Sequence, residues 1–131
     1  MLAEDNPADA RLVRRALEDY GVEGEITIFT DGETAVQFVQ SIDAREFACP
    51  DLVILDLNLP KKPGREVLEC LRLSVICHDV PVVVLTSSDA AQDRADAARL
   101  GASRYIRKPS RLEEFLSLGA LFRETLGERS V

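Results

Sequence analysis

The stretch DLVILDLNLPKKPG, residues 51–64, places a carboxylate at the end of a run that reads as a fully buried strand. The residues from Leu52 to Leu55 are all apolar, without alternation, which is typical of a strand covered on both faces. Asp56 follows directly, and an uncompensated charge in a buried position costs free energy. We therefore expect Asp56 to lie at an opening, to be paired or metal-bound, or to take part in chemistry.

Helical and strand patterns alternate on both sides of this stretch. Short runs rich in β-branched and aromatic residues predict strands at 26–29, 82–85 and 105–106. Apolar residues at helical spacing predict five helices, which begin near residues 6, 31, 64, 90 and 111. The alternation predicts an α/β fold with a parallel sheet and helices on both of its faces.

The first strand of this pattern is almost missing. A strand should precede the helix that Asn6 and Pro7 begin, but only the residues 1–3 are apolar and available. We expect this strand to be clipped or very short. Since it would lie centrally in the sheet, we also expect its shortness to reduce stability.

Composition limits the functional classes. The chain has 131 residues, 46% hydrophobic and 30% charged, which fits one globular domain over residues 1–131. No apolar run approaches the roughly 20 residues that span a bilayer, and the charges of Glu4 and Asp5 interrupt any signal peptide. The net charge of −7 argues against nucleic-acid binding. We expect a cytoplasmic protein with neither nucleic acid nor a membrane as a partner.

The three cysteines, Cys49, Cys70 and Cys77, are odd in number and lack the spacing of a disulfide framework. We expect reduced thiols, as is usual in the cytosol. His78 follows Cys77, but without a C-x-x-C pair a zinc site is not favoured.

Polar residues follow the predicted strands where ligands bind in open α/β sheets, at the carboxyl edge. They are Glu4 and Asp5 after the first strand, Asp56 and Asn58 after the third, Thr86, Ser87 and Ser88 after the fourth, and Lys108 and Pro109 after the fifth. Clustered carboxylates raise one another's pKa, and a hard cation such as Mg²⁺ relieves that repulsion. The position of Asp56 therefore makes sense at the mouth of the sheet, with a cation near it.

Four segments in this order resemble the receiver domain of two-component response regulators. They are A-E-D-N-P-A-D (3–9), V-I-L-D-L-N-L-P (53–60), V-V-L-T-S-S (83–88) and R-Y-I-R-K-P (104–109). The N-P-A-D opening and the loop L-P-K-K-P-G-R-E are similar to small regulators encoded with phytochrome-type histidine kinases. The resemblance implies a flavodoxin-like (βα)5 fold with strand order 2-1-3-4-5. It also implies a stand-alone regulator without an output domain, whose partner is a sensor histidine kinase of the bacteriophytochrome type.

The resemblance assigns roles to the acidic residues. Asp56 would be the phosphoacceptor and would form an aspartyl phosphate. Asp5 would bind Mg²⁺, or Mn²⁺, directly, and Glu4 would act mainly through a coordinated water. The backbone carbonyl of Asn58 would complete the protein ligands, together with Asp56 itself. The protein would catalyse only its own phosphoryl transfer and a slow autodephosphorylation.

The resemblance also assigns roles on the phosphoryl side. Lys108 would pair with the phosphoryl oxygens, and its peptide bond to Pro109 would be cis. Thr86 would donate its hydroxyl to the attached group, and Tyr105 would change rotamer in response; the alternative is that Tyr105 is an ordinary half-buried strand aromatic. Two hydroxyl residues would lie near the phosphoryl group: Ser87 and Ser88. The face formed by the last two helices and the last strand would carry the signal.

Three other classes fit less well. A haloacid-dehalogenase-type phosphatase needs a second aspartate two residues after the first, where this chain has Asn58, and it needs room for a cap domain. A flavodoxin-like electron carrier needs a phosphate-cradling loop after the first strand, and the sequence offers none there. A receiver that works without phosphorylation would usually lack one of the site residues.

Two helices carry further expectations. The helix at 90–100 would turn Ala91, Ala95 and Ala98 inward and dock weakly, because each missing CH₂ removes about 0.8 kcal/mol of burial. On the last helix the sheet-facing side would comprise Leu112, Phe115, Leu116, Phe122 and Leu126. Leu118 and Leu121 lie off that face, either by chance or as a contact surface, which would serve a homodimer, as we expect, or the docking of a partner.

Overall fold

Five strands alternate with five helices in the structure, a computed structural model that describes residues 1–128. The elements are β1 (Leu2–Ala3), α1 (Pro7–Asp19), β2 (Ile28–Phe29), α2 (Gly32–Asp43), β3 (Val53–Leu55), α3 (Gly64–Leu73), β4 (Val82–Thr86), α4 (Ala91–Arg99), β5 (Arg104–Arg107) and α5 (Leu112–Glu128). The strands form one parallel sheet in the order β2-β1-β3-β4-β5. The flavodoxin-like α/β fold is therefore confirmed. Among the described residues no helix has the length and apolarity to cross a membrane.

The first strand is very short, as expected, and it is central. Leu2 pairs with Ile28 of β2 on one side and with Ile54 of β3 on the other. The N-terminal ammonium group of Met1 donates a hydrogen bond to the carbonyl oxygen of Leu52 at 2.9 Å. These bonds fix the residues that follow the strand, Glu4 among them.

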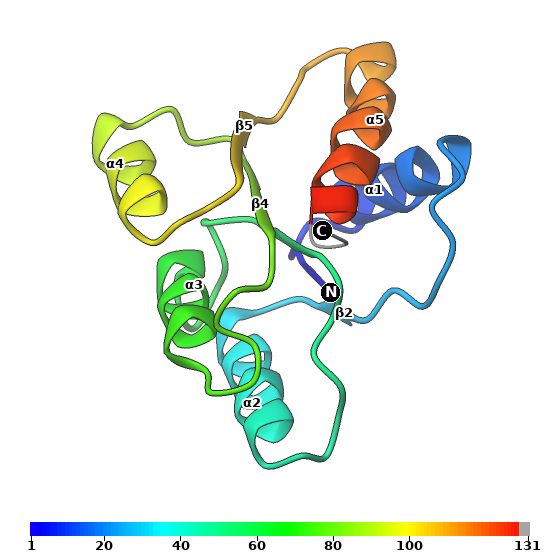
Figure 1. The fold of residues 1–131 in the computed structure, drawn as a ribbon. Coiled ribbons are helices and arrows are strands. Elements are labelled where there is room, and N and C mark those ends of the chain that lie inside the picture. The colour runs from blue at the N-terminus through cyan, green and yellow to red at the C-terminus, as the bar shows by residue number, and fades with distance from the viewer. Residues whose placement is uncertain (129–131) are drawn as a thin grey trace.

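The sheet has a hydrophobic layer on each face, and Figure 1 shows α1 and α5 on one side of the strands and α2, α3 and α4 on the other. Successive strand residues point to opposite faces. The side chains that face α2 and α3 include Val53, Leu55, Val82 and Val84, whereas those that face α1 and α5 include Ile54, Val83 and Leu85. Burial on both faces explains why β3 and β4 read as continuous apolar runs.

Local signals determine where α1 begins and ends. The side-chain oxygen of Asn6 accepts hydrogen bonds from the backbone N–H groups of Ala8 and Asp9 at 2.9 and 3.2 Å, and Pro7 is the first helical residue. Gly21, with φ of +71°, follows the helix in the left-handed region that favours glycine. Asp31 caps α2 in the same way, because its side chain accepts a hydrogen bond from the backbone N–H of Thr34 at 2.7 Å.

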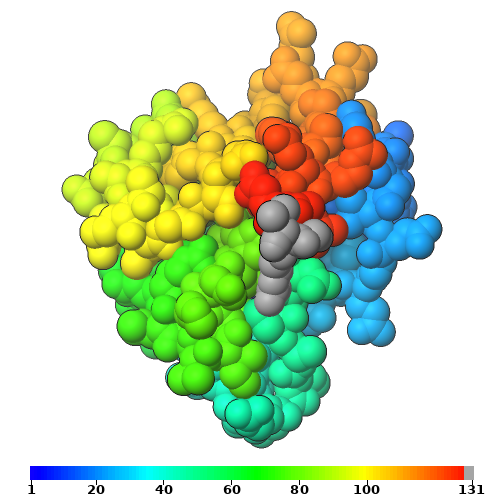
Figure 2. All heavy atoms as spheres, in the orientation of Figure 1, coloured from blue at the N-terminus to red at the C-terminus, as the bar shows by residue number. Residues whose placement is uncertain are grey.

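The expected packed face of α5 is confirmed for four residues, Phe115, Leu116, Phe122 and Leu126, and was wrong for Leu112, Leu118 and Leu121. Leu118 is buried, with 7% of its surface exposed, and Leu121 is half-buried against the same core, whereas Leu112 is 53% exposed. The reason is Gly119, where a Cβ atom would lie 2.3 Å from the carbonyl oxygen of Ala16, so that α5 approaches α1 closely and its flank is covered. Figure 2 shows these two helices in direct contact. The homodimer prediction thereby loses the observation on which it rested.

The inward face of α4 was also predicted wrongly. Ala91, Ala95 and Ala98 are exposed, and Ala97 is the buried residue of this helix. An alanine-rich helix has no bulky side chains from which the sequence could fix its rotation. Because α4 buries so little apolar surface, we still expect it to dock weakly, and this stays a prediction.

Cys49 and Cys77 form a disulfide bond, which contradicts the expectation of reduced thiols, and Cys70 is free. The two cysteines lie in the loops that precede β3 and β4, and these loops meet because the two strands are neighbours. Their Cα atoms are 5.6 Å apart, within the range that a disulfide bridges. The separation of 28 residues offers no local signal of this pairing.

We predict that the contact between α1 and α5 tolerates no methyl group at residue 119. Gly119→Ala should lower the free energy of unfolding by about 1–3 kcal/mol, because its Cβ would overlap the backbone of α1. Gly127→Ala, on the same helix, is the control: no atom lies within 4 Å of its Cβ position. It should be neutral or stabilising by up to about 1 kcal/mol. Urea unfolding of both variants tests this, and equal effects would contradict it.

Candidate functional site

The carboxyl edge of the sheet brings together the residues that the sequence placed at strand ends. Glu4 follows β1, Asp56 follows β3, and Thr86 ends β4. All three are buried, with 2%, 4% and 0% of their surfaces exposed. Lys108 follows β5 and extends its side chain toward the two carboxylates.

Lys108 is the centre of this cluster. Its ammonium nitrogen lies 2.7 Å from Oε1 of Glu4 and 2.8 Å from Oδ2 of Asp56. It also donates to Oδ2 of Asp9 at 2.8 Å, a contact that the sequence reasoning missed. Asp9 lies in the first turn of α1, four residues after Asp5. A signal existed, because the amino end of a helix that follows β1 must lie at this same edge of the sheet.

The peptide bond between Lys108 and Pro109 is trans, as are all peptide bonds in residues 1–128, so the expected cis bond was wrong. Trans is the ordinary preference even before proline. The backbone N–H of Lys108 donates to the carbonyl oxygen of Thr86 at 2.8 Å, which extends the pairing of β4 with β5 by one residue. This extension directs the lysine toward the cluster without a cis bond.

Thr86 links the carboxylate to the loop after β4. Its Oγ accepts from the side-chain amide of Asn58 at 3.5 Å and from the backbone N–H of Ser88 at 3.3 Å. The backbone N–H of Asn58 donates to Oδ1 of Asp56 at 3.0 Å. The hydroxyl of Ser88 donates to Asp93 on α4, and Ser87 is exposed. Of the two serines, Ser88 is therefore the one in this hydrogen-bonded group.

Tyr105 belongs to the same group. Its side chain is half-buried, and its hydroxyl donates to the carbonyl oxygen of Ser88 at 3.0 Å. The guanidinium of Arg94, on α4, lies over the tyrosine ring at 4.5 Å from its centroid. Arg94 also forms an ion pair with Asp89 at 2.8 Å. Tyr105 is thus held between the loop after β4 and α4.

The charges of the cluster shift its pKa values in different directions. Burial raises the pKa of Glu4 to about 7, and the nearby charge of Asp56 adds to this shift although Lys108 opposes it. Burial also acts to raise the pKa of Asp56, but hydrogen bonds from Lys108 and from the N–H of Asn58 outweigh it, and the pKa falls. Burial would lower the pKa of Lys108, yet its carboxylate partners raise it. At neutral pH the cluster therefore holds a charged lysine and a charged Asp56.

Three residues could hold a divalent cation. Glu4, Asp5 and Asp56 each offer a carboxylate oxygen, and these atoms all lie within 4.8 Å of one another. Such oxygen ligands suit a hard ion, and Asp5 is exposed at the entrance. The donor set fits Mg²⁺ or Mn²⁺.

We predict that Glu4 makes stability depend on pH. Because its pKa rises from 4.5 to about 7 on folding, the folded state binds this proton more tightly. Its contribution to stability is full below the unfolded value of 4.5 and is lost as pH rises through about 7. Gln at this position does not titrate, so the stability of Glu4→Gln relative to the parent protein should increase from about pH 5 to about pH 8.

Urea unfolding of both proteins with a chelator measures this difference at each pH. The amide that replaces the carboxyl group changes the contacts with Lys108 and with the backbone N–H of Asn6. The cost of this change does not vary with pH. Asp56 does not interfere, because its pKa is lowered from 3.8 and its contribution is lost only below that value. A difference between the two proteins that stays constant with pH would contradict the prediction.

Comparison with known proteins places this geometry in a family. The model of the response regulator receiver domain matches residues 1–118. Response regulator Rcp1 of Synechocystis sp. is 37% identical over 119 residues, which are 90% of this chain and 81% of Rcp1.

Solved structures give the same picture. The phosphorylated cyanobacterial phytochrome response regulator RcpA has a TM-score of 0.87 at 34% identity, with 99% of this chain and 94% of that chain covered. The Mn²⁺-bound form of Rcp1 has a TM-score of 0.78 at 36% identity, covering 98% and 89%. The bacteriophytochrome response regulator RtBRR has a TM-score of 0.76 at 34% identity, covering 96% and 75%. The chain therefore belongs to the family of response regulator receiver domains.

Proposed function

We propose that this chain is a response regulator in which Asp56 accepts a phosphoryl group from a sensor histidine kinase, with Mg²⁺ as cofactor. Receiver domains are phosphoacceptor signalling proteins, and the chain belongs to that family. The observation that carries the assignment to Asp56 is its contact with Lys108 at 2.8 Å, inside a cluster of carboxylates at the carboxyl edge of the sheet.

Asp56 has the properties of the nucleophile. Its lowered pKa keeps it ionised at neutral pH, as a carboxylate nucleophile must be. In the proposed step one of its oxygens bonds to phosphorus while the bond from phosphorus to the kinase's histidine breaks. The electron pair of that bond remains on the departing imidazole. The ammonium of Lys108 and the hydroxyl of Thr86 would neutralise and orient the phosphoryl oxygens.

Glu4, Asp5 and Asp56 would hold the cation, with the backbone carbonyl of Asn58 as a further ligand. A bound divalent ion supplies positive charge that offsets the charge of the incoming phosphoryl group. The relative Rcp1 is described in a Mn²⁺-bound form, which supports a divalent ion here. Since Glu4 has a pKa of about 7, this residue would release a proton when the ion binds.

A phytochrome-type histidine kinase is the partner we propose. The support comes from the relatives, because RcpA is described as a phytochrome response regulator and RtBRR as a bacteriophytochrome response regulator. At 34% identity each covers at least 96% of this chain.

The face formed by α4, β5 and α5 would carry the signal. A continuous run of hydrogen bonds leads from Asp56 through Asn58, Thr86 and Ser88 to the hydroxyl of Tyr105. The hydroxyl oxygen of Thr86 accepts two of these bonds, and its one proton could be donated to a phosphoryl oxygen. A shift of Thr86 toward that oxygen would draw the loop with it and change the partner of Tyr105.

We predict that Asp56→Asn folds and takes no phosphoryl group. The parent protein, incubated with acetyl phosphate and Mg²⁺, should gain the mass of one phosphoryl group, and a chelator should prevent the gain. Asp51→Asn is a matched control, because Asp51 is an exposed aspartate that precedes β3 as Asp56 follows it. This control should be phosphorylated like the parent protein. Efficient phosphorylation of Asp56→Asn at another carboxylate would refute the assignment.

We also predict that α4 responds first to phosphorylation. Ala97 is its buried residue, so local opening should cost little free energy. Beryllofluoride, which mimics the phosphoryl group, should change amide hydrogen exchange in α4 and in the loop 87–90 more than in α1 to α3. Exchange that the mimic leaves unchanged in α4, or changes equally in all helices, would count against this signalling face.

A further inference from the structure

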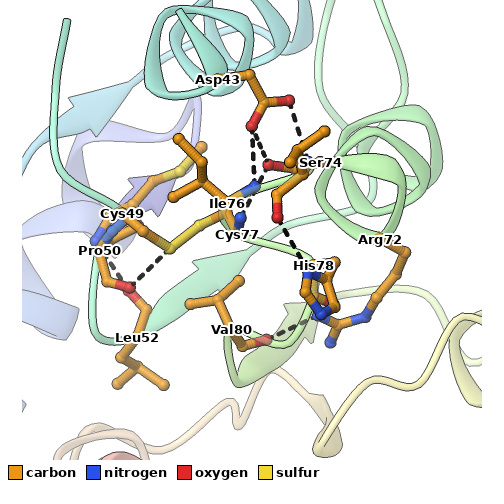
Figure 3. The surroundings of a disulfide bond; sticks show 12 residues. Asp43, Cys49, Pro50, Leu52, Arg72, Ser74, Ile76, Cys77, His78 and Val80 are labelled. Carbon is orange, nitrogen blue, oxygen red and sulfur yellow. Dashed lines mark hydrogen bonds between the residues drawn. A yellow bond between two sulfur atoms is a disulfide. The ribbon is translucent and has the colours of Figure 1, made fainter. Parts of the chain in front are cut away.

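The disulfide between Cys49 and Cys77 lies at the end of the sheet opposite to the phosphoacceptor site. Cys49 lies four residues before β3, whose other end leads into Asp56, and Cys77 lies five residues before β4, which ends at Thr86. Figure 3 shows the bond among residues of α2, of the loop that follows it and of the loop between α3 and β4. The proposed phosphoryl chemistry makes no use of this bond.

The loop between α3 and β4 is anchored in the protein independently of the disulfide. Ser74, Cys77 and Val80 are buried, with 3%, 0% and 0% of their surfaces exposed. The carboxylate of Asp43 accepts from the hydroxyl of Ser74 at 2.5 Å and from the backbone N–H of Ile76 at 3.2 Å. The hydroxyl oxygen of Ser74 in turn accepts from the N–H of Cys77 at 2.9 Å (Figure 3). Cys77 would therefore stay in place if the disulfide were absent.

Arg72 adds a second anchor to this loop. Its guanidinium donates to the carbonyl oxygens of Val80 at 2.8 Å and His78 at 3.1 Å. The same group donates to the carbonyl oxygens of Leu100 and Gly101, so it also ties this loop to the end of α4.

The segment that carries Cys49, residues 44–50, is more exposed than the loop that carries Cys77. Residues 44–48 are exposed, Cys49 and Pro50 are half-buried, and none of the seven is buried. Phe47 is 57% exposed, although its ring contacts that of Phe38 with centroids 5.5 Å apart. The backbone N–H groups of residues 44–46 donate to carbonyl oxygens near the end of α2 at 2.9–3.0 Å. The disulfide thus adds a covalent tie between a buried loop and an exposed one that follows α2.

We propose that Cys49 and Cys77 form a reversible dithiol–disulfide site whose oxidation state determines how firmly the segment 44–50 is held. The oxidant is a low-molecular-weight disulfide. The thiolate of one cysteine attacks a sulfur of that disulfide and releases one small thiol. The second cysteine then attacks the mixed disulfide and releases the other small thiol, so two electrons and two protons leave the cysteine pair. Reduction by two small thiols is the reverse.

Exposure assigns different roles to the two cysteines. Cys49 is half-buried at the surface and can meet a small thiol or disulfide, whereas Cys77 is fully buried in the core between the sheet and α2 and α3. The exchange therefore begins at the sulfur of Cys49. Cys70 is the free thiol, and burial raises its pKa, which reduces its reactivity as a nucleophile.

Release of the segment would also widen the mouth of a cavity. The cavity has a volume of about 300 Å³, and its wall includes Ala48, Cys49 and Pro50. Its lining reaches Met1 and Phe38, so a loosened segment exposes apolar surface there. An environment-sensitive dye that fluoresces on apolar surface reports this exposure.

Thiol trapping of the native full chain tests the site. The native protein is equilibrated without oxygen at graded ratios of reduced to oxidised glutathione, quenched with acid, unfolded and alkylated, and mapped by mass spectrometry. We expect Cys70 to be alkylated at every ratio, and a disulfide-linked peptide pair containing Cys49 and Cys77 to appear as the oxidised form increases. Three alkylated cysteines at every ratio would overturn the proposal. A disulfide that involves Cys70, or one that no ratio reduces without denaturant, would overturn it as well.

Hydrogen exchange tests the conformational consequence. Reduction should speed amide exchange in residues 44–49 and increase dye fluorescence, while the loop 74–80 keeps its protection. Cys49→Ser should reproduce the reduced state under oxidising conditions, and Cys70→Ser should behave like the parent protein. Equal exchange in oxidised and reduced protein would refute the conformational part. Phosphorylation with acetyl phosphate should proceed in both states, so this test stands apart from that of Asp56.

Discussion

The ammonium group of Lys108 is the interaction on which the site depends. It lies within 2.8 Å of oxygens from Glu4, Asp9 and Asp56, which come from the end of β1, the first turn of α1 and the end of β3. These segments meet only if the strands run parallel and end at one edge. One positive charge cannot balance three carboxylates and the neighbouring Asp5. Burial raises the pKa of Glu4, and the charge of Asp56 adds to that shift. The excess of negative charge is what a divalent cation would relieve.

The packing far from the site determines the position of Asp9. This residue is part of α1, whose beginning is fixed by the side chain of Asn6 and whose later turns pack against α5. Gly119 permits the close approach, since any side chain there would meet the carbonyl oxygen of Ala16. The contact between α1 and α5 therefore helps to keep the carboxylate of Asp9 within reach of Lys108, although no residue of α5 touches the cluster's carboxylates directly in the contacts described.

The sequence predicted the fold class and the strand-end residues because those signals are local. A buried strand that ends leaves its next residues at the edge of the sheet, whatever the rotation of the surrounding helices. Asp56, Glu4 and Lys108 each directly follow a strand end, and the structure brings them together. Helix rotation is harder to infer, because an error of one position turns a side chain by about 100°. For this reason Leu118 and the face of α4 were predicted wrongly.

The disulfide is harder to predict from the sequence than the strand-end residues, because it depends on how β3 and β4 are paired. Val53 of β3 pairs with Val82 of β4, and from this register Cys49 and Cys77 come out four and five residues before paired positions. This register implies that the two cysteines lie side by side. Strands buried on both faces carry no alternation, however, and alternation is the feature that specifies register in a sequence. The continuous apolar run that identifies β3 as a central strand is thus also what hides its register, and with it the proximity of the two cysteines.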